Sequence, residues 1–101
     1  MPIRLDLPAR DAICAAQARG ANAVTLDQTA HMAAIKTDIR QMSTLMKQAG
    51  NAIGKAIGDG DMTVEDGAAL GDLLEESSTH LTLANLPTAV PGLTAACSMF
   101  D

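Results

Sequence analysis

Large aromatic side chains are almost absent from this sequence. Its 101 residues include one Phe, Phe100, and no Trp or Tyr. Apolar residues make up 48% of the chain, but 19 of them are alanine, which removes little surface from water when it is buried. The sequence therefore excludes a core of large aromatic side chains. It favours closely packed helices, in a single domain over residues 1–101, or burial of surface against another chain.

Positive charge is also scarce. Seven Lys and Arg residues stand against twelve Asp and Glu residues, so the net charge is −5. An acidic surface repels phosphate backbones, and the shortage of aromatic rings removes the stacking platforms that bind bases, so we expect no nucleic-acid partner. The charged fraction is 19%, below the average of about 25%. This low fraction indicates that part of the surface is covered in the working state.

Cysteine occurs only twice, at Cys14 and Cys97, without the spacing of a metal site. The simplest interpretation is two small, buried or half-buried thiols, and a disulfide is the alternative. The first residues lack a basic region followed by an apolar run, so we expect no signal peptide. The expected location is the cytoplasm, or a particle assembled there.

Catalytic motifs are missing. The chain has no HExxH, no GxSxG and no glycine-rich phosphate loop after a strand, so we expect no enzyme activity and no cofactor. His31 and His80 each follow a carboxylate by four residues, a spacing that can orient a histidine for metal binding. Exposed helix pairs explain this spacing more simply. The acidic turn at Asp59 lacks the central Gly and terminal Glu of a calcium loop, so no metal site is predicted.

Helix signals organise the chain into three parts. Residues 1–24 read as a short arm and a helix that ends near Arg19, before Gly20. Thr25 and Thr63 each open a capping box, so helices are predicted at about 26–57 and 63–80. These two helices would form a long antiparallel hairpin over residues 25–80. Residues 81–101 carry two prolines four apart, and we expect an irregular tail there, uncharged from Leu81 to Phe100.

The first hairpin helix carries an apolar seam. Apolar residues recur there in alternating steps of three and four over more than three heptads. Such a seam fits a coiled coil or the core stripe of a small bundle. We expect its first half to remain open for a protein partner or a second copy, and flexible methionine suits that surface. The predicted association surface consists of Met32, Ile35, Ile39, Met42, Leu45 and Met46.

Four glycines lie at helical spacing in the predicted hairpin. Gly50 and Gly71 lie at equal distances from the turn, and so do Gly54 and Gly67. The matched register predicts a tight helix crossing, because glycine costs about 1 kcal/mol in a helix unless close packing offsets it. GxxxG spacing also occurs in membrane helix pairs, but charged residues interrupt both segments here. The predicted packing set consists of Gly50, Ile53, Gly54, Gly67, Ala68 and Gly71.

The sequence thus predicts a small all-α, acidic interaction protein without enzyme activity. It would bind a protein partner or itself, as a structural subunit, an adaptor or an inhibitor. Small inhibitors from phages and mobile elements share this composition. The inference of a similar role is an analogy only. One alternative is a membrane-associated helical protein that uses the glycine helices and the tail. Another is a helical bundle that binds a metal or a ligand.

Overall fold

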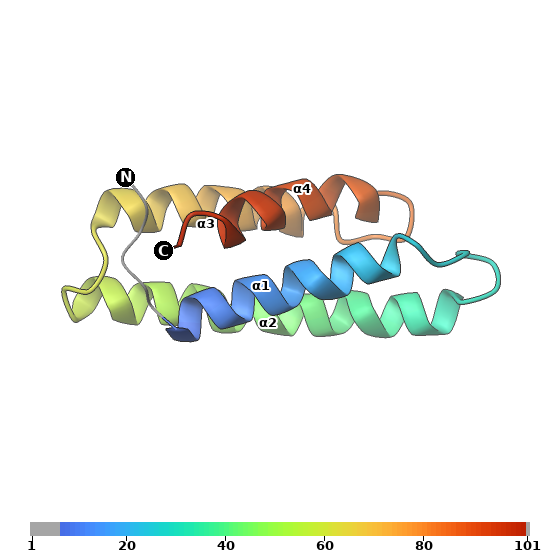
Figure 1. The fold of residues 1–101 in the computed structure, drawn as a ribbon, viewed down its shortest axis with the longest axis horizontal. Helices are drawn as coiled ribbons and strands as arrows, with labels where there is room; N and C mark the ends of the chain where they lie inside the picture. Colours follow the sequence, from blue (N-terminus) through green and yellow to red (C-terminus); the bar gives the residue numbers. More distant parts are fainter. Residues whose placement is uncertain (1–6, 101) are drawn as a thin grey trace.

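Four helices form an antiparallel bundle (Figure 1). The computed structural model describes residues 7–100, and it contains α1 (Leu7–Ala23), α2 (Met32–Gly58), α3 (Val64–Ser78) and α4 (Leu86–Cys97). Each helix packs against the next, and α4 returns to α1. Within residues 7–100, the diagonal pairs α1–α3 and α2–α4 make no close backbone approach. The bundle measures 46 × 20 × 20 Å, and the predicted all-α class is confirmed.

Small residues form the buried face of α1, which makes the most extensive contact in the bundle, with α2. The predicted stop at Gly20 is wrong, because α1 continues to Ala23. A Cβ at Gly20 would lie 2.8 Å from Met42 Cε and 3.0 Å from Val90 Cγ2. Glycine therefore lets α1 approach α2 and α4 closely at this point. The other buried residues of this face are Ala9, Ala12, Ile13, Ala16 and Ala23.

The long helix begins later than the sequence predicts. It starts at Met32 instead of residue 26, and the expected capping box at Thr25 does not form. The Thr25 hydroxyl instead donates to the Asn22 carbonyl oxygen at 2.6 Å, and Gln28 Nε2 donates to the Leu83 carbonyl oxygen at 2.5 Å. The Thr25 bond is local to the end of α1, and the Gln28 bond fastens the α1–α2 loop to the α3–α4 loop.

At the second capping signal, Thr63 caps the helix, which is one of the two bonds of the predicted capping box. Thr63 precedes α3, and its hydroxyl accepts a hydrogen bond from the Asp66 backbone N–H at 3.1 Å. Gly60, in the turn before it, has a φ of 81°, which glycine adopts without strain. The helix then ends at Ser78, two residues before the predicted boundary.

The expectation of an irregular tail over residues 81–101 is wrong for α4. Pro87 lies in the first turn of α4, where backbone N–H groups have no helical partner and proline costs little. Pro91 lies inside the helix and removes one hydrogen bond of the ladder. Buried apolar contacts offset this loss, because one side of α4 is fully covered. Its buried residues are Leu86, Ala89, Leu93 and Ala96.

A buried serine joins α3 to α4. Ser77 is 1% exposed, and its hydroxyl donates to the Ala89 carbonyl oxygen at 3.0 Å. Gly92 lies directly over this hydroxyl. The hydroxyl oxygen occupies the space that a Cβ on Gly92 would need. The Leu73 carbonyl oxygen lies 3.4 Å from the same position. The α3–α4 contact thus depends on a glycine facing a hydrogen-bonded serine.

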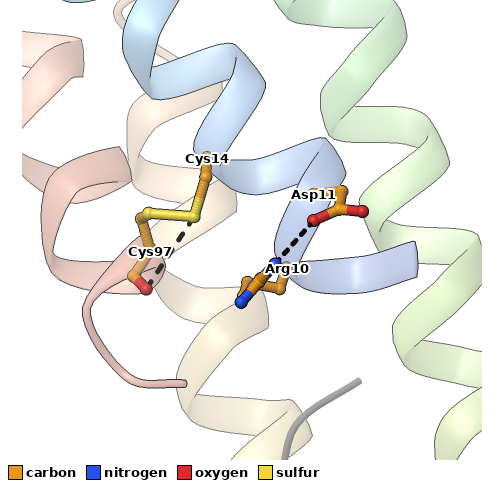
Figure 2. A network of polar contacts seen from close by, with 4 residues as sticks. All are labelled: Arg10, Asp11, Cys14 and Cys97. Carbon is orange, nitrogen blue, oxygen red and sulfur yellow. Dashed lines mark hydrogen bonds and ion pairs between the residues drawn. A yellow bond between two sulfur atoms is a disulfide. The ribbon is translucent and has the colours of Figure 1, made fainter. Parts of the chain in front are cut away.

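A disulfide joins α1 to α4. Cys14 and Cys97, 83 residues apart, are bonded, with their Cα atoms 5.1 Å apart (Figure 2). The sequence favoured two free thiols and kept a disulfide as the alternative, and the fold brings the two residues together in that alternative. Figure 2 also shows the Arg10–Asp11 ion pair, 3.2 Å long on the surface, which adds little stability. Beyond the disulfide, Gln17 Nε2 donates to Thr94 Oγ1 at 3.4 Å, also between α1 and α4.

We expect Gly92→Ala to lower the free energy of unfolding. A methyl group there either overpacks the contact or turns the Ser77 hydroxyl away from its acceptor, at a cost of about 1–3 kcal/mol. Gly54→Ala is the matched control, because a Cβ at Gly54 would meet no atom within 4 Å. It should raise stability by up to about 1 kcal/mol through helix propensity. Urea unfolding of both variants tests this, and equal effects would contradict the packing described.

Removal of the disulfide should lower stability by about 4–5 kcal/mol, since the bond closes a long loop and restricts the unfolded chain. The double variant Cys14→Ser with Cys97→Ser should therefore unfold at a clearly lower urea concentration than the wild type. Reduced wild type should match the variant. An unchanged midpoint after reduction would show that the bond contributes nothing to stability.

Candidate functional site

The predicted association surface lies mostly inside the bundle. Ile35, Met42 and Met46 are buried, and Ile39 and Leu45 are half-buried and pack against the core. Only Met32 remains largely open, at 45% exposure. The expectation of a free apolar patch over this half of α2 is therefore wrong. The alanine face of α1 covers it, because small side chains let the two helices approach closely.

The predicted glycine-to-glycine contact between α2 and α3 is also wrong. A Cβ added at Gly50, Gly54 or Gly71 would meet no atom within 4 Å. Gly67 alone is tightly packed, and its neighbours are the side chains of Ile57 and Ile53.

The isoleucines explain why the glycine pairs do not meet. Ile57 and Ile53 stand between α2 and α3, so the helices are held apart by the thickness of a side chain. Ile53 is 6% exposed, whereas Ala68, predicted to face it, is exposed. The contact between α2 and α3 is the least extensive of the four in the bundle.

An apolar groove occupies the space where Gly50 and Gly71 were expected to touch. It lies between α2 and α3 and has a volume of about 450 Å³. On α2 it extends from Ser43 to Ile53, which corresponds to about 15 Å along the helix axis. Figure 1 shows α2 and α3 side by side, behind α1 and α4. The apolar side chains that line the groove are Met46, Ile53, Leu74 and Leu81.

Missing side chains leave space within the groove. Gly50 on α2 and Gly71 on α3 both line it, and nothing stands where their Cβ atoms would be. Met46, Ile53 and Leu74 are 6–7% exposed at its floor. The sequence identified Gly50 and Gly71 as a facing pair, and the structure places both at this groove, but as its open walls.

Basic residues form a row along the α2 side of the groove. Lys47 lines it, and Arg40 and Lys36 precede Lys47 by seven and eleven residues, so all three lie on one stripe of the helix. All are exposed. Asp38, the one acid of α2, is half-buried and pairs with Arg19 of α1 at 3.3 Å. The groove side of α2 is therefore positive only.

Acidic residues form the opposite row on α3, which has no basic residue. Glu75 lines the groove and Asp72 precedes it by three residues, and both are exposed. Within the described range, ion pairs form only between Arg10 and Asp11 and between Arg19 and Asp38. The charges at the two rims of the groove are thus unpaired and of opposite sign.

The histidines and cysteines do not form a shared site. His31 is exposed before α2 and His80 is half-buried after α3, while both sulfur atoms are used in the disulfide. Over residues 7–100, no group of three His, Cys, Asp or Glu side chains could hold a metal ion. None of the described helices is long and apolar enough to cross a membrane.

The groove was not predicted from the sequence, although the sequence contains a signal for it. The stripe of Lys36, Arg40 and Lys47 on one helix and the acids of the next helix could be read from spacing alone. Comparisons with protein families, curated proteins and solved structures found no match to this chain. The function must therefore be inferred from the geometry and charge of the groove itself.

Proposed function

We propose that the protein binds a partner protein, without enzyme activity, through the groove between α2 and α3. The observation that carries this proposal is an open apolar groove between two rows of unpaired, opposite charges. Apolar surface in the centre and charge at the edge is the usual anatomy of a protein interface. A structural subunit, an adaptor and an inhibitor could each use such a surface.

A small molecule fits the groove less well than a protein does. The volume, about 450 Å³, falls within the range of ligand pockets. Such pockets, however, enclose most of their ligand and hold a few convergent polar groups inside. Here the polar groups stand at the rims, and the basic row continues beyond the groove to Lys36. An extended partner can reach that row, whereas a compact ligand in the groove cannot.

We infer an oxidising compartment in place of the cytoplasm that the sequence suggested. The bond between Cys14 and Cys97 supports this inference, because reducing systems keep most cytosolic thiols free. Rapid alkylation of cell extracts tests it. Both cysteines should resist alkylation unless a reductant is added first, and two freely alkylated thiols would restore the cytoplasmic interpretation.

We expect Gly50→Leu to abolish partner binding without harming the fold. A Cβ there would meet no atom within 4 Å, leucine improves helix propensity by about 1 kcal/mol, and the rest of its side chain would occupy the groove. The measurement is quantitative capture from the source cell, with the purified chain as bait and thermal unfolding as the check of folding.

Gly54→Leu is the matched control for this experiment. Gly54 lies one turn further along the same helix, a Cβ there would also meet no atom within 4 Å, and it does not line the groove. This variant should keep every partner that the wild type captures. Loss of partners in both variants, or in neither, would remove the groove from the proposed function.

A further inference from the structure

We propose that the occupant of the groove is a single amphipathic helix of a partner protein, with acidic residues along one edge of its apolar face and basic residues along the other. This inference rests on the proposed function and specifies the partner. Its apolar face would lie on the floor formed by Met46, Ile53 and Leu74. Its acidic edge would lie along α2 and its basic edge along α3.

The dimensions of the groove suit a helix. A length of about 15 Å accommodates nearly three helical turns, so apolar residues at steps of three and four would reach the floor. Gly50 and Gly71 carry no Cβ, and nothing else fills the space beside them. Another backbone can therefore approach both walls closely, which gains dispersion contacts along its whole length.

Charge complementarity selects the edges of this helix. Lys36, Arg40 and Lys47 would face the acidic edge, and Asp72 and Glu75 would face the basic edge. A helix with two basic edges would meet attraction at α3 and repulsion at α2. A helix with two acidic edges would meet the reverse. Only mixed edges are attracted to both walls.

A second copy of this chain is a poorer occupant. A two-fold axis parallel to the helices would place α2 of each copy on α3 of the other, which matches the charges, but the two grooves would then face each other with nothing between them. An axis across the helices would instead place α2 on α2, with like charges opposed. Among the residues whose burial the structure describes, the exposed large apolar side chains, Val24, Met32 and Val64, lie outside the groove. They cannot fill it in either arrangement.

Synthetic helical peptides test this proposal on the oxidised, full-length chain. Three peptides share one apolar face and differ at its edges: Glu on one and Lys on the other, Lys on both, or Glu on both. The mixed peptide should bind roughly tenfold more tightly than either uniform one, because several exposed ion pairs each contribute a small factor. The difference should shrink as salt is raised. Lys47→Glu should weaken the preference for the mixed peptide over the peptide with Lys on both edges.

The direction in which a peptide lies in the groove is a second readout. A nonspecific apolar surface would not fix that direction. A fourth peptide, with the Glu and Lys edges exchanged, should bind as tightly as the mixed one but in the reverse direction. A photo-crosslinker at the peptide N-terminus would reveal this. It should attach near Leu81 for one peptide and near Ile57 for the other. Gly50→Leu should prevent both attachments, and Gly54→Leu should not.

Several results would overturn the inference. Equal affinities for all edge patterns, or attachment at both ends of the groove by one peptide, would remove the charge rule. Binding that survives Gly50→Leu would place the peptides elsewhere. A wild type that sediments as a dimer and is dissociated by Gly50→Leu would identify a second copy as the occupant. If no peptide binds but Gly50→Leu still abolishes capture of the natural partner, the proposed function stands and the helix proposal fails.

Discussion

Close approach of α1 to its neighbours is the constraint on which the rest of the structure depends. A chain with one aromatic residue and many alanines cannot bury much apolar area per side chain, so it must bring backbones together. The alanine face of α1 and the missing Cβ of Gly20 allow this against α2 and α4. Once α1 fixes those two helices, the position of α3 is set by α4 through the Ser77–Gly92 contact.

The groove follows from this arrangement. The position of α3 is set by α4, and the side chains of Ile53 and Ile57 stand between it and α2. Where the facing positions are Gly50 and Gly71, no side chain bridges the remaining space. Glycine therefore has opposite consequences in one small bundle. At Gly20 and Gly92 it allows helices to touch, and at Gly50 and Gly71 it leaves room for something else.

Local signals in the sequence predicted α3 well and the rest of the fold in part. Periodicity and capping gave the all-α class and the start of α3 at Thr63, because those signals act within a few residues. The capping box at Thr25 failed because Gln28 bonds to Leu83, far along the chain. Pro87 and Pro91 argued against a helix that buried contacts nevertheless stabilise. Gly50 and Gly71, which the register matched, line one groove, but spacing alone could not distinguish contact from a gap between them.

The disulfide has a topological consequence. Cys14 and Cys97 lie 83 residues apart, and all three connecting loops, 24–31, 59–63 and 79–85, fall between them. That part of the chain is a covalent circle, so one proteolytic cut in a loop opens it without releasing a fragment. A cut molecule keeps all four helices tethered and can hold its native arrangement. Two cuts are needed to release α2 or α3, and α1 and α4 stay joined to each other until the sulfur–sulfur bond is broken as well.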